Sequence, residues 1–349
     1  MDWCRHLCRK AHASSWRVQY SDIQIEKELC RTLKSTMHLG RWKGANVVVK
    51  SLLAADGKPS EDSMEASPAS VAEELLHEID VLSSIRHPDL VLFLGACLDT
   101  THTIACITEY MPGGDLEAFY VAKRAKHQAS VWHPHLKQVL QWATAIARGL
   151  LFLHTREVPL IHRDLKPLNL LLTKHLDLKI ADLGISRVLA AGKGLQLRSE
   201  RFAGGMTESA VSAAEVARDH YYNEKVDIYA FALILYFMSS GRQPFHHMGT
   251  EFVLDLFVEA GADDRWLAEC PRKLRGLLAA AWAADAAKRP GAASMLASLE
   301  ALESEVAGNP CVSLLYLQGL SCLGTWDGRP WIQEHSRVFG PNDAVEAHE

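Results

Sequence analysis

The chain has 349 residues, of which 48% are hydrophobic and 23% charged, a composition that is ordinary for a globular protein with a sizeable core. Its formal net charge of −5 gives no reason to expect a nucleic-acid-binding surface. The eight cysteines form no CxxC pair, and a chain of this length needs no disulfide framework, so we expect reduced thiols and a cytoplasmic location.

The first part of the chain predicts mainly strands. Residues 1–15 form a basic leader without the apolar core of a signal peptide, and we expect this leader to be flexible. From residue 16 to residue 107 short β-branched runs dominate, with clear examples at 47–49 and 104–108. Such runs are typical of strands in a small sheet.

One helix interrupts these predicted strands. Residues 71–85 place large apolar side chains at helical spacing, at Leu75, Ile79 and Leu82. The preceding segment, residues 54–70, is acidic and rich in Ser, Ala and Pro, which predicts a mobile surface insert.

The second part of the chain predicts mainly helices. Residues 226–240 are almost wholly apolar but too short to span a membrane, so they predict a buried core helix. Helices continue to near Glu305, and the tail at 305–349 shows no clear period. Behind Pro134, a core-facing helix is indicated by apolar residues that recur every 3.6 positions: Leu136, Val139, Leu140, Ala143, Ile146, Ala147 and Leu150.

The most specific pattern is IHRDLKPLNLLL at residues 161–172. Polar groups stand at fixed spacing in this otherwise apolar segment: His162, Arg163, Asp164, Lys166 and Asn169. A polar turn between a helix and a strand would be the simplest explanation, but buried ionisable groups are costly unless a site uses them. Ten residues later KIADLGISR, residues 179–187, carries Asp182 in a turn after a strand. Either pattern alone could arise by chance, but the two together predict a functional site.

These motifs resemble those of the eukaryotic protein kinases, over roughly residues 16–304. The segment from His162 to Asn169 fits the catalytic-loop pattern H-R-D-L-x-x-x-N, and Asp182-Leu183-Gly184 looks like the D-F-G turn. The run VVVK, which ends at Lys50, is similar to V-A-I-K. The segments GACL, ITEYMPGGDL and DLKPLN look most like the tyrosine kinase-like group, whose members mostly phosphorylate Ser and Thr.

The resemblance implies an α+β fold of two lobes, the bilobal protein kinase fold. A small antiparallel sheet with one helix would form the N-lobe at residues 16–107. The hinge would lie at residues 108–113, and a larger, mainly α-helical C-lobe would occupy residues 114–304. The leader and the tail would then lie outside the kinase domain.

The resemblance also implies roles for the polar residues. Asp164 would orient the substrate hydroxyl and accept its proton, with Lys166 on the transferred phosphate as in serine/threonine kinases. Asn169 and Asp182 would be the Mg²⁺ ligands, since their hard oxygen atoms suit that ion. Lys50 would contact the α- and β-phosphates of ATP.

The remaining ATP-binding positions follow from the same alignment. Glu78 would hold Lys50; Glu73 and Glu74 are nearby, and their simplest explanation is solvated charges on a helix face. Thr108 falls at the gatekeeper position, and Glu109 to Met111 would be the hinge that bonds adenine. Further positions around the nucleotide are Leu29, Met37, Val48 and Leu171.

The phosphate-binding loop departs from the family pattern. Aligning Met37 with the valine of G-x-G-x-x-G-x-V puts Cys30, Thr32 and Ser35 at the three glycines. Glycine there lets the backbone approach phosphate without a Cβ in the way. Ser and Thr are small and carry hydroxyl donors, so nucleotide binding would be weakened rather than prevented. Val48 replaces the usual small residue and tightens the adenine pocket.

The activation segment departs as well. SAAEV at 212–216 stands where A-P-E belongs, although its glutamate, Glu215, and that glutamate's expected partner, Arg289, are kept. Ser199 and Thr207 lie in mid-segment, and a phosphate there would contact Arg163. An upstream kinase acting on this segment is therefore an implied partner.

Two functions remain open from the sequence. The first is an ATP- and Mg²⁺-dependent Ser/Thr protein kinase, a transferase that phosphorylates protein hydroxyls in signalling. The second is a pseudokinase scaffold, a binding module whose degenerate loop gives weak or no catalysis. Neither reading requires nucleic acid or a membrane span.

Overall fold

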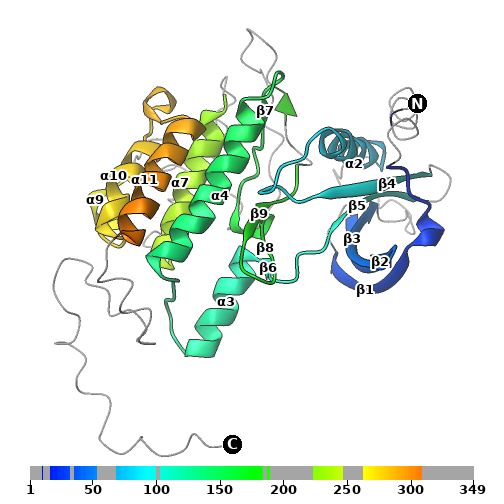
Figure 1. Cartoon of the computed structure of the whole chain (residues 1–349), viewed down its shortest axis with the longest axis horizontal. Helices are drawn as coiled ribbons and strands as arrows, with labels where there is room; N and C mark the ends of the chain where they lie inside the picture. The colour runs from blue at the N-terminus through cyan, green and yellow to red at the C-terminus, as the bar shows by residue number, and fades with distance from the viewer. Residues whose placement is uncertain are drawn as a thin grey trace, which may run out of the picture.

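The structure, a computed structural model, describes residues 10, 16–31, 35–52, 68–99, 103–183, 187–188, 223–246 and 262–308. In this part of the chain, a small lobe carries the main sheet and a larger lobe carries most of the helices (Figure 1). The predicted two-lobed α+β fold is confirmed. The expectations for most of the leader and insert, for the activation segment around Ser199, Thr207 and Glu215, and for residues 309–349 lie outside the described residues.

The small lobe is built on one antiparallel sheet of five strands in the order β1-β2-β3-β5-β4. The turn between β2 and β3 has positive φ at both central residues, Lys43 and Gly44, which a two-residue hairpin turn that follows the sheet's twist requires. The strands are β1 (Gln24–Arg31), β2 (Ser35–Trp42), β3 (Ala45–Leu52), β4 (Phe93–Asp99) and β5 (Thr103–Glu109).

Strand β3 fixes the direction of the site lysine. Val47 and Val49 are completely buried in the core of the small lobe. Because side chains alternate along a strand, Val48 and Lys50 must point to the opposite face, and both are half-buried there. The strand register places Val48 directly opposite Thr108 on β5.

Helix α2 (Pro68–Ser83) lies over the sheet and buries Leu75, Ile79 and Leu82, as their spacing predicted (Figure 1). The helix starts three residues earlier than predicted and inside the expected insert, because proline suits the first turn, where its missing N–H is not needed. It also stops short of residue 85, at the point where the hydroxyls of Ser83 and Ser84 donate to carbonyls of the last turn.

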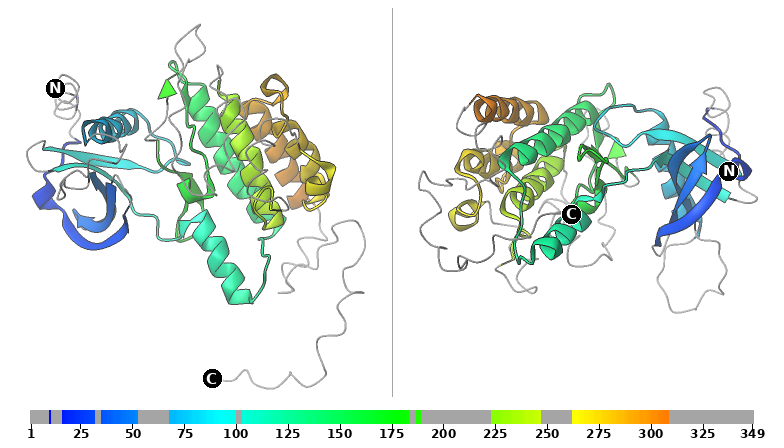
Figure 2. Two further views of the ribbon diagram at one scale, coloured as in Figure 1. Left: turned by 180° about the vertical axis from the view of Figure 1, so that it is seen from behind. Right: turned by 60° about the horizontal axis from the view of Figure 1, so that its bottom comes forward.

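The large lobe is organised around α7, in which every residue from Val226 to Ser240 is buried. This confirms the core helix predicted from its apolar run. Helix α7 lies against α4 and α10, and α11 lies against α4 (Figure 2). The helices are α3 (Leu116–His127), α4 (Leu136–His154), α7 (Lys225–Ser240), α9 (Asp264–Leu267), α10 (Arg272–Ala281) and α11 (Ala292–Ala307).

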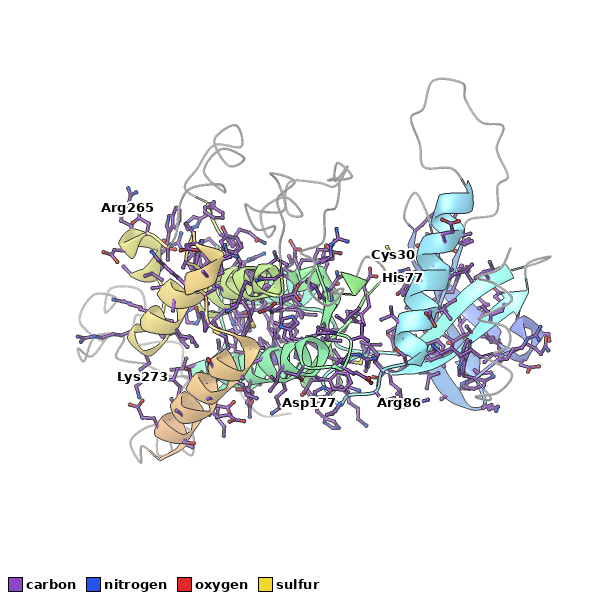
Figure 3. All side chains as sticks on the ribbon, turned by 90° about the horizontal axis from the view of Figure 1, so that it is seen from above. Cys30, His77, Arg86, Asp177, Arg265 and Lys273 are labelled. Carbon is purple, nitrogen blue, oxygen red and sulfur yellow. The ribbon has the colours of Figure 1, made fainter. Side chains whose placement is uncertain are left out.

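In Figure 3, Arg265 and Lys273 mark the end of the large lobe that is far from the sheet, whereas Cys30 and His77 belong to the small lobe. None of the helices within the described ranges combines the length and apolar character that crossing a bilayer demands.

Short elements between α4 and the small lobe position the catalytic loop, residues 162–169. The strand before Asp182 was predicted and is present as residues 178–180; the sequence did not predict the others, because two or three residues are too few to show a period. One sheet contains β6 (Gly114–Asp115), β8 (Leu170–Leu172) and β9 (Leu178–Ile180), and a second pairs β7 (Leu160–Ile161) with β10 (Arg187–Val188). The 3₁₀ turns are η1 (Tyr20–Asp22), η2 (Pro167–Asn169) and η3 (Ala286–Lys288).

Candidate active site

The predicted ion pair between Lys50 and Glu78 is present. The Lys50 Nζ atom lies 2.7 Å from Glu78 Oε2 and 3.3 Å from Asp182 Oδ1. Glu78, not the exposed Glu73, is the α2 carboxylate that meets the lysine, and only 5% of Glu78 is exposed. A single cation from β3 thus links helix α2 of the small lobe to the turn after β9 of the large lobe.

Burial and charge oppose each other at this ion pair. Burial alone would lower the pKa of Lys50, but the charges of Glu78 and Asp182 outweigh it and raise that pKa, so the lysine stays protonated. The pKa of Glu78 is raised because burial disfavours its charged form and Asp182 repels it, with Lys50 only partly compensating. The carboxylate therefore depends on the lysine to remain ionised.

The start of the catalytic loop is fixed by Asp227 of α7, which is 1% exposed. Its Oδ2 accepts hydrogen bonds from the backbone N–H of His162 at 2.9 Å and from His154 Nε2 at 2.7 Å, and its Oδ1 accepts from the N–H of Arg163 at 2.8 Å. Burial would raise the pKa of Asp227, yet the hydrogen bond and charge of His154, together with the N–H of Arg163, lower it. Three donors thus hold one buried carboxylate in its charged form.

This anchoring coincides with an unusual backbone. Arg163 has φ of +71° and Asp182 has φ of +59°, a region that side-chain-bearing residues rarely adopt. Such conformations persist where the surroundings enforce them. At Arg163 the enforcing contact is the bond from its own N–H to Asp227.

His162 joins the catalytic loop to the Asp182 turn. Its ring is completely buried; Nδ1 lies 3.2 Å from the backbone N of Asp164, and Nε2 lies 3.1 Å from the carbonyl oxygen of Ala181. The backbone N–H can only donate and the carbonyl can only accept, so these contacts fit a neutral ring with its proton on Nε2. The ring therefore couples the two motifs that the sequence singled out.

Asp164 is oriented by two neighbours in the loop. The Nδ2 of Asn169 donates to the Asp164 carbonyl oxygen at 2.7 Å and to its Oδ2 at 2.9 Å, and Lys166 Nζ lies 3.0 Å from that same Oδ2. Among the described residues, Oδ1 of Asp164 accepts no hydrogen bond. One carboxylate oxygen is thus held by the loop, and the other can receive a proton.

The candidate metal ligands Asn169 and Asp182 stand on directly bonded segments, because the N–H of Ala181 donates to the Asn169 carbonyl at 2.8 Å. Since the Nδ2 of Asn169 is directed to Asp164, its amide oxygen is the atom suited to a cation. An amide oxygen with a carboxylate is a donor set that Mg²⁺ accepts. The residues present therefore fit the ion that the motifs implied.

The side chains expected around adenine are only partly buried. Leu29 on β1 is 39% exposed, and Met37, Val48, Thr108 and Leu171 are half-buried, whereas Met111 is buried. Met37 lies directly opposite Lys50 and Val48 directly opposite Thr108, so these side chains belong to neighbouring strands. Partly exposed apolar side chains near Lys50 would suit a flat aromatic base.

The Glu109 side chain forms an ion pair and accepts a backbone hydrogen bond at the expected hinge. Its Oε1 lies 2.6 Å from Lys179 Nζ on β9 and accepts a hydrogen bond from the N–H of Leu92 at 2.8 Å. A second ion pair, between Arg148 of α4 and Asp89, is bidentate at 2.8 and 3.0 Å. Neither pair could be predicted from the sequence, because their members are 70 and 59 positions apart with no local pattern to connect them.

The β1–β2 hairpin combines a fully exposed first strand with a buried serine at the start of the second. All eight residues of β1, including Cys30, are exposed. Ser35, at the third glycine position, is buried and lies within β2, paired with Leu52. The neighbouring Thr36 hydroxyl is 3.1 Å from that of Ser51. Thr32, at the second glycine position, is outside the described residues.

Arg289 is 2% exposed and donates to the carbonyl oxygens of Ala283, Ala284 and Lys225 at 2.7 to 3.2 Å. Its guanidinium also lies over the ring of Tyr229. Its expected partner Glu215 is outside the described residues, so that pairing remains a prediction.

Comparison with known proteins decides the family. The sequence profile of the family "Protein tyrosine and serine/threonine kinase" matches residues 23–299. The chain belongs to this family. Its relatives include plant kinases of the tyrosine kinase-like group, as the motifs indicated.

Three relatives illustrate the range of this kinase family. A "Probable serine/threonine-protein kinase" of Dictyostelium discoideum is 33% identical over 275 residues, which are 78% of this chain and 19% of that protein. "Serine/threonine-protein kinase CTR1" of Arabidopsis thaliana is 30% identical over 82% of this chain and 32% of that protein. "Serine/threonine-protein kinase VIK" of Arabidopsis thaliana is 32% identical over 75% of this chain and 56% of that protein. The chain therefore spans less than two thirds of each relative.

Proposed function

We propose that this kinase domain is catalytically active and transfers the γ-phosphoryl group of ATP to Ser or Thr hydroxyls of proteins. The observation that carries the proposal is the connected set of polar contacts from Glu78 through Lys50 to Asp182, together with the orientation of Asp164 by Asn169. Phosphoryl transfer asks mainly for positioning and charge neutralisation, and this set provides both.

In the proposed reaction, Asp164 receives the acceptor hydroxyl at Oδ1, because Oδ2 is held by Asn169 and Lys166. The hydroxyl proton passes to that carboxylate as the acceptor oxygen forms its bond to the γ-phosphorus, while the bond from this phosphorus to the β–γ bridging oxygen breaks and ADP leaves with the electron pair. ATP bound with Mg²⁺ supplies the phosphoryl group and neutralises part of its charge. Lys166 stands next to the base and can contact the phosphate in transfer, while Lys50 binds the α- and β-phosphates.

Nucleotide binding involves the remaining predicted positions. Glu109 and Met111 at the hinge would bond adenine through their backbones, and Leu29, Val48 and Leu171 would cover its faces. Asn169 and Asp182 would hold Mg²⁺. The proposal includes a role in signalling, a cytoplasmic location, and an upstream kinase that phosphorylates the activation segment at Ser199 or Thr207.

The second candidate function is a pseudokinase scaffold. The observation that favours it is the hairpin: Cys30 and Ser35 replace glycines, and Ser35 continues the regular pairing of β2. A backbone that carries Cβ atoms at these positions approaches phosphate less closely. This candidate predicts weak nucleotide binding and no transfer.

Radiolabel transfer from ATP to a generic basic protein distinguishes an active kinase from a pseudokinase scaffold. Wild type is compared with Asp164→Asn, which keeps the size of the side chain, and with the control Asp264→Asn on α9 at the far end of the large lobe. We expect transfer by wild type and control and a loss of about 10²–10⁴-fold in Asp164→Asn. Absence of transfer by wild type at saturating Mg²⁺-ATP would instead establish the scaffold.

A further inference from the structure

A lysine from outside the matched kinase region contacts the end of helix α2. The Lys10 Nζ atom lies 2.6 Å from Asp80 Oδ1 and donates to the Asp80 carbonyl oxygen at 3.3 Å. Lys10 precedes the region that matches the kinase family, which begins at residue 23. The contact therefore joins α2 to a part of the chain that the family match does not cover.

The contact lies at the negative end of the helix dipole. Asp80 begins the last turn of α2, whose carbonyl groups carry that partial charge, and this turn contains no basic residue of its own. Two arginines lie nearby: Arg86 is exposed beyond the end of the helix, and Arg156 reaches the Ser84 hydroxyl at 3.5 Å. Lys10 is bonded to the last turn itself, through both the side chain and the backbone of Asp80.

The chain that carries Lys10 is fixed to the edge of the sheet. Trp16 is 6% exposed, its carbonyl accepts from the N–H of Ala96 on β4 at 3.0 Å, and the N–H of Val18 donates to the Ala96 carbonyl at 3.0 Å. The Trp16 ring meets Phe93 edge-on, with 5.5 Å between the ring centroids. Lys10 stands six residues before this anchor, a length that spans at most about 22 Å. The tether keeps the ammonium group near α2 and lowers the entropy lost when the ion pair forms.

Asp80 and Glu78 belong to the same helix but face different ways. Two positions of an α-helix turn by about 200° and advance by about 3 Å. The Asp80 side chain is 28% exposed, whereas Glu78 is buried against Lys50. Lys10 therefore acts on the Lys50–Glu78 pair through the position of the helix, from the side opposite Glu78.

We propose that Lys10 is a positioning residue, which holds α2 where Glu78 can pair with Lys50. This inference rests on the proposed function, since that pair positions the phosphates of ATP in the same reaction. The side chains of Lys10 and Asp80 are 30% and 28% exposed, and an ion pair of this exposure changes a two-state equilibrium by at most about fivefold. The expected effect is thus a bias in the position of α2.

The thiol of Cys106 can report the position of α2 without any reaction. Cys106 is 1% exposed, lies directly opposite Lys50 on β5, and belongs to the same apolar cluster as the buried face of α2. Burial and the charge of Glu78 raise the pKa of this thiol, so alkylation requires its exposure to water. Cys97 is equally buried but belongs to the second apolar cluster of the small lobe, so its labelling reports a general opening of the sheet.

The test treats the full chain, without nucleotide, with N-ethylmaleimide and follows the labelling rates of both thiols by peptide mass spectrometry. Lys10→Gln and Asp80→Asn should each label Cys106 about two- to fivefold faster than wild type, with the Cys97 rate unchanged. The exchanged pair Lys10→Asp/Asp80→Lys should restore slow labelling, because it forms the ion pair in the opposite sense. Lys27→Gln, at an exposed lysine of β1, is the matched control and should change neither rate.

Three results would overturn the inference. The first is equal labelling of Cys106 in wild type and Lys10→Gln. The second is an equal increase at Cys97, which would mean that the lysine stabilises the small lobe as a whole. The third is fast labelling of Cys106 in the exchanged pair, which would mean that the ion pair itself is not what holds the helix.

Transfer kinetics separate this inference from the proposed reaction. In an active enzyme, Lys10→Gln should lower kcat/KM for transfer by about two- to fivefold, and the exchanged pair should recover it. Faster labelling with an unchanged kcat/KM would contradict the positioning role. If wild type transfers no phosphate, the proposed function fails, but the labelling rates still decide whether Lys10 holds α2 in place.

Discussion

The catalytic loop of the large lobe is fixed by buried hydrogen bonds, whereas the β1–β2 hairpin of the small lobe starts from an entirely exposed strand. His162, Arg163 and Asp164 are each bonded to a neighbouring segment or residue in the loop. In the hairpin, Cys30 and Ser35 are held by strand pairing with Met37 and Leu52.

The two regions therefore respond differently to substitution. The residues proposed for proton transfer and metal binding sit in segments joined by several hydrogen bonds, so substitution there would disturb many contacts. The hairpin lacks glycine at the three loop positions of the family pattern, whereas Ser35 keeps its pairing with Leu52 in the sheet. We therefore expect changes at the loop to abolish activity and changes at the hairpin to tune nucleotide affinity.

The largest effect should come from removing the loop's anchor. Asp227→Ala leaves the N–H groups of His162 and Arg163 and the ring of His154 without their buried acceptor. We expect a loss of about 3–5 kcal/mol in the free energy of unfolding and loss of transfer activity. Chemical denaturation measures the first and the radiolabel assay the second.

The contribution of Asp227 to stability should also depend on pH. The pKa of Asp227 is lowered in the folded protein, so its contribution is complete above the ordinary aspartate pKa of about 3.9 and is lost as pH falls through the lower folded value. The stability gap between wild type and Asp227→Ala should therefore narrow only in this acidic range. A gap that closes between pH 7 and pH 5 would contradict the assignment.

The next largest loss of stability and activity should come from removing Lys50, which links Glu78 of the small lobe to Asp182 of the large lobe. Lys50→Met leaves Glu78 buried without its cation, which should cost about 2–4 kcal/mol at pH 7 and abolish transfer. Because the pKa of Glu78 is raised in the fold, this cost should shrink as pH is lowered towards 4.5 and the carboxyl becomes protonated.

The double variant Lys50→Met/Glu78→Gln separates stability from catalysis. Removing both charges should restore most of the unfolding free energy, since no unpaired carboxylate remains, but transfer should stay absent. Recovered activity in the double variant would show that Lys50 has no phosphate-binding role.

A smaller effect is expected at the hinge. Glu109 and Lys179 are about a fifth to a quarter exposed, so their ion pair should contribute about 0.5–1 kcal/mol. Lys179→Met should lower Tm by roughly 1–4 °C, while Lys174→Met on the exposed turn before β9 serves as a control. An equal change in Tm in both variants would mean that the ion pair between Glu109 and Lys179 does not contribute to the free energy of unfolding.

The smallest effects should appear at the hairpin. Ser35→Gly alone should cost about 0.5 kcal/mol or less, because glycine loses more backbone entropy on folding but Ser35 stands at the first position of β2 rather than in its interior. Thr32→Gly with Ser35→Gly should nevertheless improve ATP affinity by letting backbone amides approach the phosphates. An affinity that is unchanged or lowered in isothermal titration would show that the hairpin binds nucleotide through its side chains.

The sequence predicted the parts of the structure that are encoded locally. The β-branched run at 47–49 predicted a strand, and these residues lie with Lys50 in β3. The motif resemblance singled out Glu78 as the partner of Lys50, and Glu78 is the α2 carboxylate that meets this lysine. The catalytic-loop motif located Asp164 and Asn169 within one turn of each other.

What the sequence could not predict depends on distant partners. Lys179 and Arg148 are ordinary charged residues in their own segments, and only the fold brings them to Glu109 and Asp89. Lys10 likewise meets Asp80 across 70 positions of chain, which no local pattern signals. The roles of the site residues in catalysis remain predictions.

The decisive kinetic experiment measures kcat and the KM for ATP of the full chain, with Mg²⁺-ATP raised well above 1 mM. An intact catalytic loop, under a hairpin in which Cys30, Thr32 and Ser35 replace the three loop glycines, predicts saturable transfer with a KM at or above about 1 mM, the upper end of the usual range, and a kcat that Asp164→Asn abolishes. Transfer that is absent at every ATP concentration, or that persists in Asp164→Asn, would contradict the account.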